Sequence, residues 1–278
     1  MDHERGNIMS RTFKLRLLAL CGLLLLVSSC SNVAITGRKQ FNLVPNSVMN
    51  SMSFQSYGEF LSQNKLSSNT RQSQMVENIG RRIQKAVEQY CAGNNLADRL
   101  EGYEWEFKLI EDPNANAWCM PGGKVVVYTG LLPVTQNESG LAVVIGHEIA
   151  HAIARHGAER MTQGLIVEMG SMALSQALAK SPEKTKDLFM RSYGIGTQYG
   201  ILLPYSRVHE TEADHMGLIF MAMAGYNPND ALSFWERMSA AKQGTSPPEL
   251  LSTHPADATR IRNIKEFMPE AMTYYHQP

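Results

Sequence analysis

Residues 137–161 read NESGLAVVIGHEIAHAIARHGAERM and contain the motif HEIAH at residues 147–151. Residues four apart lie on the same face of a helix, so the imidazoles of His147 and His151 can bind one zinc ion. Glu148, beside the first histidine, would then face a zinc-bound water as a general base. The alternative is a helix on whose solvated face these residues meet by chance.

The segment around the motif is predicted to be a buried helix. Asn137 is a suitable N-cap, and apolar residues recur at helical spacing. They are Leu141, Val144, Ile145, Ile149 and Ala152. Two histidines and a glutamate inside such a helix carry a large desolvation penalty unless they are paired or bind a metal. This penalty favours the metal site over the chance arrangement.

A catalytic zinc takes three protein ligands and keeps one position open for water. The metzincin spacing requires glycine at position 154 and histidine at position 157, where this chain has Ala154 and Gly157, so that class is excluded. His156 follows His147 by nine residues and is predicted on the opposite side of the same helix. It is therefore interpreted as a surface residue or one behind the ligands.

The missing ligand is expected from the later segment SRVHETEADH, residues 206–215. Glu210 and Asp214 are four apart and share one face of a predicted helix, whereas Glu212 points to the far side. Glu210 is the obvious third ligand, with Asp214 accepting the other N–H of a zinc-bound histidine. Two alternatives stay open: a solvated acidic face, and a shifted register in which Glu212 is the ligand.

The order of the predicted elements indicates the fold class. Helices are expected for residues 46–61 and about 70–90, strands for 105–110, 116–120 and 124–129, and mainly helices after residue 137. Strands gathered early and helices gathered late predict an α+β domain, mainly helical, with a small sheet beside the zinc-binding helix. At 44% hydrophobic and 19% charged, the 278-residue sequence suits one globular domain, which is predicted to span residues 46–278. Basic and acidic residues number 26 each, so no basic field points to nucleic acid.

The N-terminal residues 1–29 are predicted to be a lipoprotein signal peptide. A basic region precedes the apolar residues 17–27, and the run ends in VSSC at Cys30. This ending resembles a bacterial lipobox, which would make Cys30 the acylated first residue of a tether over residues 30–45. An uncleaved signal anchor is the alternative, although the run is short for a membrane span. Met9 is an alternative start.

The residues after the lipobox indicate a location. Residues 31–32 contain no acidic side chain. By resemblance to Gram-negative lipoproteins, this favours the outer membrane, facing the periplasm, over retention in the inner membrane. That oxidising compartment would permit a disulfide between Cys91 and Cys119, and two buried thiols are the alternative.

The HEIAH run and the later SRVHETEAD segment together resemble one gluzincin family. It contains the heat-shock protease HtpX, the CAAX prenyl endopeptidases and periplasmic lipoprotein peptidases such as LoiP and BepA. The layout is most similar to that of the last group, without the C-terminal helical-repeat domain of BepA, and the similarity runs from Thr36 to the C-terminus. The resemblance implies a zinc endopeptidase with one Zn²⁺ per chain. It further implies that His147, His151 and Glu210 bind the zinc. Glu148 would be the general base, and Asp214 would orient a ligand histidine.

Two further motifs resemble the same family. Residues 114–118, NANAW, with the turn PGG after them, resemble the strand at the edge of the cleft, where a substrate backbone could add at Asn116, Ala117 and Trp118. Trp118 stands where similar sequences often carry phenylalanine, which leaves the shape of the local pocket open.

The second motif is STHP with a later arginine. His254, alone or together with Arg260, could stabilise the oxyanion of the intermediate, or His254 could occupy the open zinc position and hold the enzyme latent. The remaining alternative is a helix-capping histidine before Pro255.

The resemblance implies misfolded or misassembled envelope proteins as substrates, with membrane attachment through the lipid at Cys30. A function of another class is a lipoprotein chaperone or assembly factor that binds clients at the edge strand, with a structural or latent zinc. An inner-membrane protease of the CAAX type is disfavoured because no later stretch resembles a transmembrane helix.

Overall fold

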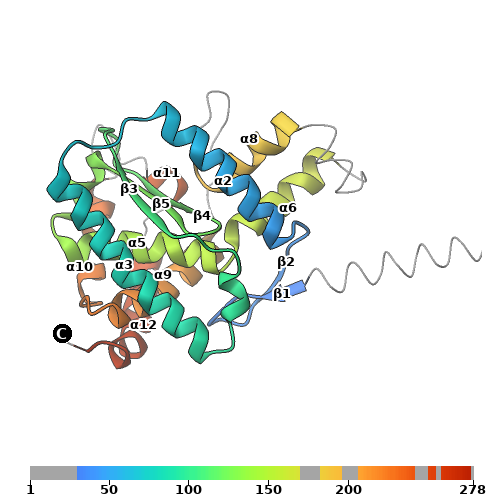
Figure 1. Cartoon of the computed structure of the whole chain (residues 1–278). Helices are drawn as coiled ribbons and strands as arrows, with labels where there is room; N and C mark the ends of the chain where they lie inside the picture. The colour runs from blue at the N-terminus through green and yellow to red at the C-terminus, as the bar shows by residue number, and fades with distance from the viewer. Residues whose placement is uncertain (1–29, 170–181, 196–205, 242–249, 255–257, 277–278) are drawn as a thin grey trace, which may run out of the picture.

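The computed structural model describes residues 30–169, 182–195, 206–241, 250–254 and 258–276 (Figure 1). The expected signal peptide lies outside these ranges. The strands are β1 (Cys30–Asn32), β2 (Lys39–Phe41), β3 (Glu106–Ile110), β4 (Ala117–Met120) and β5 (Lys124–Tyr128). The longer helices are α2 (Asn46–Gln63), α3 (Thr70–Gly93), α5 (Glu138–Ile153), α6 (His156–Met169), α8 (Pro182–Ser192), α9 (Arg207–Met223), α10 (Asp230–Ala241) and α12 (Ala258–Thr273). The short helices are η1 (Ala97–Leu100), η2 (Thr129–Leu131), α4 (Leu132–Thr135) and α11 (Leu250–Thr253). The prediction of a mainly helical α+β domain with a small early sheet is confirmed.

The sheet has the strand order β3-β5-β4 within the described residues. β3 runs parallel to β5, and β4 runs antiparallel to it. The tight turn between β4 and β5 places Gly122 and Gly123 at φ values of 77° and 80°. Glycine adopts such values without the steric penalty of a Cβ atom. In the strand order given above, β4 pairs with β5 on one side and is an edge strand of this sheet. It begins at Ala117.

The two faces of this sheet meet different helices because side chains alternate along a strand. Ala117 and Cys119 of β4 belong to the core cluster that also contains the buried faces of α3, α5 and α9. Trp118 and Met120 belong to the cluster that contains α2. In Figure 1, α2 runs along the upper side of the sheet, while α5 and α9 lie below it. The helix with the HEIAH motif thus packs on the Ala117 side.

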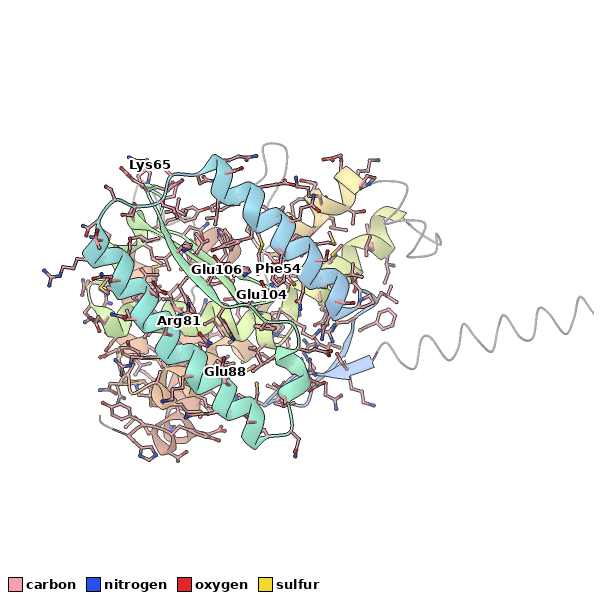
Figure 2. The ribbon with its side chains drawn as sticks, viewed as in Figure 1. Phe54, Lys65, Arg81, Glu88, Glu104 and Glu106 are labelled. Atoms are coloured by element: carbon pink, nitrogen blue, oxygen red, sulfur yellow. The ribbon has the colours of Figure 1, made fainter. Side chains whose placement is uncertain are left out.

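A buried lysine fastens α2 to the other face. Lys124 Nζ donates to the carboxylate of Glu106 at 2.8 Å and to the backbone oxygen of Glu104 at 2.6 Å. The same ammonium lies 4.7 Å from the ring centroid of Phe54 in α2, within range of a cation–π contact. Figure 2 shows Phe54, Glu104 and Glu106 gathered at this end of the sheet. Lys124 therefore ties the start of β5 to α2.

Helix α5 begins where the sequence predicts and ends earlier than predicted. The side chain of Asn137 accepts the backbone N–H of Gly140 at 2.8 Å, which is an N-cap bond. Residues 140–153 are all buried, because apolar and small side chains surround the helix. Arg155 has a φ of 61°, and α6 starts at the next residue. The prediction of a single helix continuing to residue 161 is therefore wrong, and His156 belongs to another helix.

Two glycines let α5 and α9 cross in backbone contact. A Cβ atom on Gly146 would lie 3.0 Å from the carbonyl oxygen of Gly217. A Cβ atom on Gly217 would lie 3.0 Å from the backbone nitrogen of His147. Side chains larger than hydrogen would thus push the helices apart. This close crossing brings the first turn of α9 beside the HEIAH motif.

The segment expected to be a tether is part of the fold. β1 and β2 form an antiparallel hairpin, with Asn32 paired to Lys39. Val33 and Ala34 are buried in the main core, and Val44 is buried in the second cluster. Because these apolar side chains are buried against the domain, the folded unit begins before the expected boundary at Asn46.

Both cysteines in the body of the protein are free thiols. Cys91 in α3 and Cys119 in β4 are buried and unbonded to each other, which matches the alternative of two thiols. Burial raises the pKa of Cys91 to about 11, so this thiol stays protonated at neutral pH. Among the described residues, no helix combines the length and the apolar character needed to cross a membrane.

Candidate metal centre

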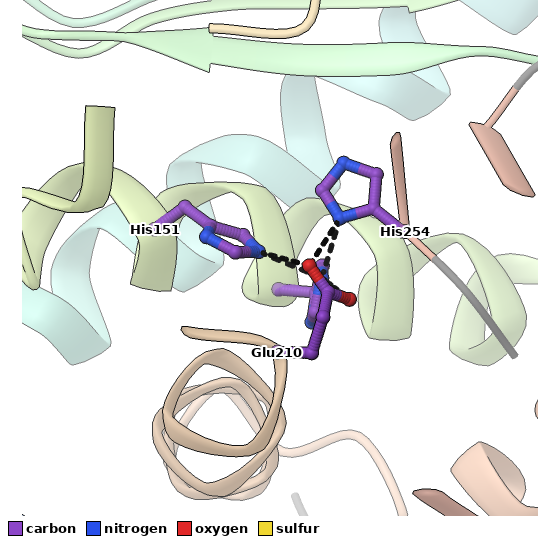
Figure 3. Close-up of side chains that lie close together, drawn as sticks. His151, Glu210 and His254 are labelled. Carbon is purple, nitrogen blue, oxygen red and sulfur yellow. Dashed lines mark hydrogen bonds and ion pairs between the residues drawn. The ribbon is translucent and has the colours of Figure 1, made fainter. Parts of the chain in front are cut away.

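Four buried side chains converge at the crossing of α5 and α9. His147 and His151 come from α5, Glu210 from the first turn of α9, and His254 from the residue after α11. One ligand atom from each side chain lies within 4.8 Å of all the others. Figure 3 shows the rings of His151 and His254 turned toward the carboxylate of Glu210. The structure thus joins the predicted ligands and adds His254 to them.

The spacing of these atoms fits a tetrahedral metal site. His147 Nε2 lies 3.0 Å from His151 Nε2 and 3.2 Å from His254 Nδ1. Glu210 Oε1 lies 3.3 Å from His151 Nε2 and 3.0 Å from His254 Nδ1. Ligands at about 2.0–2.1 Å from zinc form a tetrahedron with edges of about 3.3–3.4 Å. Three imidazoles and one carboxylate are also donors that suit zinc.

His147 is oriented from behind by a carboxylate. Its Nδ1 lies 2.9 Å from Asp214 Oδ1, so the N–H at Nδ1 is donated and Nε2 keeps its lone pair for a metal. Arg260 Nη2 donates to the same Asp214 oxygen at 2.7 Å, and its Nη1 lies 2.8 Å from Glu210 Oε2. Arg260 therefore holds the ligand carboxylate and the orienting carboxylate in one arrangement.

Trp235 was not identified from the sequence. Its indole is buried in α10, with the guanidinium carbon of Arg260 3.3 Å from the ring centroid. Its ring centroid also lies 5.8 Å from that of His147. A tryptophan on the apolar face of a helix has the same pattern as any core residue, so spacing alone gave no signal for this contact.

Glu148 is buried beside the four ligands without being one of them. Within the described residues, its Oε1 atom makes no hydrogen bond. The same atom lies 3.4 Å from His254 Nε2 and would form an ion pair with a protonated imidazole. Burial, with the charge of Glu210 adding to it and that of His254 opposing it, raises the pKa of Glu148 to about 7. A carboxylate with this pKa can both accept and return a proton near neutral pH.

Glu212 lies on the far side of α9 from the four ligand atoms. Its carboxylate accepts hydrogen bonds from Thr36 and Arg38 of the N-terminal hairpin, at 2.8 and 2.9 Å. The alternative in which Glu212 is the metal ligand is therefore wrong for this structure. Its other contact is His156 Nε2 at 3.0 Å.

His156 lies behind the ligands, as one of the two interpretations expected. The expectation that it belongs to the same helix as His147 was wrong, because it begins α6. It is fully buried at the start of α6, with its Nδ1 atom 2.9 Å from His151 Nδ1. Burial lowers the pKa of His156 to about 4, against the opposing effect of Glu212, so the ring is neutral at physiological pH. A neutral imidazole has one donor nitrogen and one acceptor nitrogen.

The edge strand lies beside α5, but its tryptophan faces away. The Trp118 ring packs edge-to-face on Phe60 and Tyr57 of α2, at centroid distances of 4.9 and 6.3 Å. The Asn116 side chain is buried and caps the backbone N–H of Ala117 at 2.9 Å. Trp118 therefore lies on the side of the sheet opposite α5, and the binding of a substrate strand at this edge stays a prediction.

The segment that carries His254 touches the residue before this strand. The backbone N–H of Leu250 donates to the carbonyl oxygen of Ala115 at 3.1 Å. The His254 N–H in turn donates to the carbonyl oxygen of Leu250 at 2.9 Å. Through α11, the fourth residue of the cluster is thus linked to the start of the edge strand.

Comparison with known proteins places these residues in context. Residues 78–268 match the model of Peptidase family M48. Over 240 residues the chain is 35% identical to the mitochondrial metalloendopeptidase OMA1 of Schizosaccharomyces pombe, covering 86% of this chain and 66% of that protein. It is 30% identical over 186 residues to the beta-barrel assembly-enhancing protease of Escherichia coli, covering 62% of this chain and 37% of that protein. The chain thus spans about two thirds or less of the length of both relatives.

Proposed function

The chain belongs to peptidase family M48, and on that premise we propose that it is a zinc-dependent endopeptidase that cleaves unfolded or misassembled proteins. One observation carries the proposal. The carboxylate of Glu148 has an oxygen without a hydrogen-bond partner in the described structure, and it adjoins a cluster of metal-ligand side chains. A purely structural metal site does not need a further buried carboxylate beside its ligands, because burying the carboxylate carries a desolvation penalty.

The roles of the residues follow from their contacts. Bound zinc would polarise the scissile carbonyl and lower the pKa of a water molecule. Glu148 takes a proton from the attacking water and returns it to the leaving amine nitrogen. Asp214 keeps the N–H of His147 at Nδ1, 2.9 Å away, so that the opposite nitrogen faces the site.

Arg260 pairs with two carboxylates of the site. Its two terminal nitrogens are directed at the carboxylates of Glu210 and Asp214, at 2.8 and 2.7 Å. It therefore fixes the ligand set and leaves stabilisation of the carbonyl oxygen to other groups.

One observation favours a second candidate function. His254 Nδ1 lies at the fourth corner of the cluster, where a hydrolytic zinc needs an open position. In this arrangement the site is closed. A latent or chaperone-like zinc lipoprotein, which binds client proteins with little proteolysis, would keep it closed permanently. We infer instead that the closed arrangement is a resting state of the peptidase.

Unfolded casein tests the proposed activity. The purified zinc-loaded protein is expected to cleave it, and removal of zinc by a chelator should stop cleavage because the ligands then hold no metal to activate water. Returning zinc should restore the rate, as followed by gel electrophoresis of the products. Cleavage that persists after zinc content has fallen to background would contradict a zinc-dependent mechanism.

We also propose that the protein is lipid-anchored at Cys30 in the bacterial outer membrane, facing the periplasm, and acts there in protein quality control on envelope proteins. The support is the lipobox-like ending at residues 27–30 and the absence of an acidic residue at 31–32. The name of the E. coli relative connects that protein with beta-barrel assembly. Because β1 starts at Cys30, such a lipid would be attached directly to the folded domain.

Mass spectrometry of the protein extracted from bacterial membranes tests this anchor. The N-terminal peptide is expected to begin at Cys30 and to carry the mass of attached acyl chains. A Cys30→Ser variant should then appear with residues 1–29 still present, because the lipobox cysteine is the site of both lipidation and processing. An unlipidated wild-type chain would rule out the anchor while leaving the peptidase proposal intact.

A further inference from the structure

The second histidine of the HEIAH motif reaches a carboxylate through an intervening side chain, whereas the first reaches one directly. His147 meets the carboxylate of Asp214 directly, at 2.9 Å. His151 instead meets another imidazole, because its Nδ1 atom lies 2.9 Å from Nδ1 of His156. His156 then meets a carboxylate, with Nε2 3.0 Å from Glu212 Oε2. Each histidine is thus backed by a glutamate or aspartate, one directly and one through an inserted ring.

The positions of the protons on His151 and His156 follow from the contacts of the two rings. His151 directs Nε2 at the other ligands, so its proton is on Nδ1 when Nε2 binds a metal. His156 must then accept at Nδ1, which places its own proton on Nε2. That proton is donated to Glu212, an acceptor when ionised. The Glu212 carboxylate therefore selects the tautomers of both rings.

The N-terminal hairpin holds this carboxylate. Arg38 donates from Nε to Glu212 Oε1 at 2.9 Å and from Nη2 to Oε2 at 3.1 Å. Thr36 Oγ1 donates to Oε1 at 2.8 Å. The Glu212 side chain is only 4% exposed, so without Arg38 its charge would be buried with much less compensation.

The same arginine also reaches the helix that carries His156. Arg38 Nη1 and Nη2 donate to the two carboxylate oxygens of Glu159 in α6, at 2.9 and 2.7 Å. Glu159 additionally lies 3.1 Å from Nε2 of His209 in α9. One guanidinium therefore joins α6 to α9 directly behind the metal ligands, which sets the position of His156 between Glu212 and His151.

We propose that the N-terminal hairpin is a working part of the metal site, in which Arg38, Glu212 and His156 are positioning residues for the ligand His151. The inference rests on the metal binding of the proposed function and is independent of which peptides are cleaved. Loss of these successive hydrogen bonds frees the His151 ring to rotate and to change tautomer. Partners behind a metal ligand typically alter metal affinity about 10–100-fold.

Zinc affinity, measured by competition with a fluorescent chelator, tests the proposal on the full chain. His156→Leu and Arg38→Gln are each expected to raise the zinc dissociation constant about 10–100-fold. His156→Gln should recover much of the loss, since its amide oxygen can accept from His151 and its N–H can donate to Glu212. Lys39→Gln is the matched control, because it removes an exposed positive charge from the same hairpin, and its affinity should stay as in the wild type.

A second measurement separates positioning from general loss of structure. Nitrogen–proton correlation spectra of the zinc-loaded protein report the tautomer of each histidine. His151 should carry its proton on Nδ1 and His156 on Nε2, and the His151 signal should broaden or shift in Arg38→Gln while circular dichroism is unchanged. Wild-type affinity in both His156→Leu and Arg38→Gln, or the opposite tautomer in the wild type, would overturn the inference. If the wild-type protein binds no zinc, the proposed function fails instead.

Discussion

Glu148→Gln is expected to lower the rate of casein cleavage by at least about 100-fold while the zinc content stays that of the wild type. General acid–base groups contribute about 10²–10⁴ to rates, and glutamine cannot accept the proton of an attacking water. Zinc is retained because Glu148 is not one of the four clustered ligand residues. Cleavage rate and metal analysis on the same preparation are the two measurements.

The control for this substitution is Glu138→Gln. Glu138 is an exposed glutamate in the first turn of the same helix, so the change from carboxylate to amide is identical but lies far along α5 from the motif. Its cleavage rate should equal that of the wild type. Retained cleavage in Glu148→Gln would exclude Glu148 as the base, and a parallel loss of zinc would show that its role is structural.

His254→Ala is expected to increase casein cleavage by on the order of tenfold. The imidazole nitrogen at the fourth corner lies 3.2 Å from His147 Nε2 and 3.0 Å from Glu210 Oε1, where a water and the substrate carbonyl must enter. If about nine molecules in ten are closed, freeing this corner raises the competent fraction about tenfold. Zinc content should stay high, because His147, His151 and Glu210 remain as three ligands.

A loss of cleavage in His254→Ala, with zinc retained, would instead assign His254 to the stabilisation of the carbonyl oxygen during attack. Absence of cleavage in both the wild type and this variant would favour the chaperone-like function. His276→Ala is the control, since it removes an exposed histidine near the C-terminus and should leave the rate unchanged.

Features local in sequence were predicted well. The N-cap bond of Asn137, the strand pair joined at residues 121–123 and the apolar face of α5 each depend on residues a few positions apart. Capping, turn chemistry and helical spacing act over that same range, so the pattern and the structure report one set of interactions.

Predictions that required knowing which surfaces meet were less successful. Alternation along β4 shows that Ala117 and Trp118 point to opposite faces, but it does not show which face meets α5. Residues 33–34 fall in the segment after the lipobox-like ending that was predicted to be a tether. Their burial depends on a core built from helices far along the chain.

The position of His156 shows the same limit most clearly. A continuous helix would have directed it away from His151, whereas the left-handed residue Arg155 starts a new helix and returns the ring to within 2.9 Å. Arg155 itself does not mark that break, because arginine favours ordinary helical geometry. The surrounding packing imposes it.

Three features could be predicted from the sequence: the α+β class, the helix with the HEIAH motif, and the placement of Glu210 and Asp214 on one face of a later helix. Spacing along a helix and along a strand is enough for these features. The folded structure alone shows that His254 lies 3.2 Å from His147 and that Arg38 and His156 lie behind His151. Those contacts join residues more than a hundred positions apart or across a helix break, and they depend on the close crossing of α5 and α9 at Gly146 and Gly217.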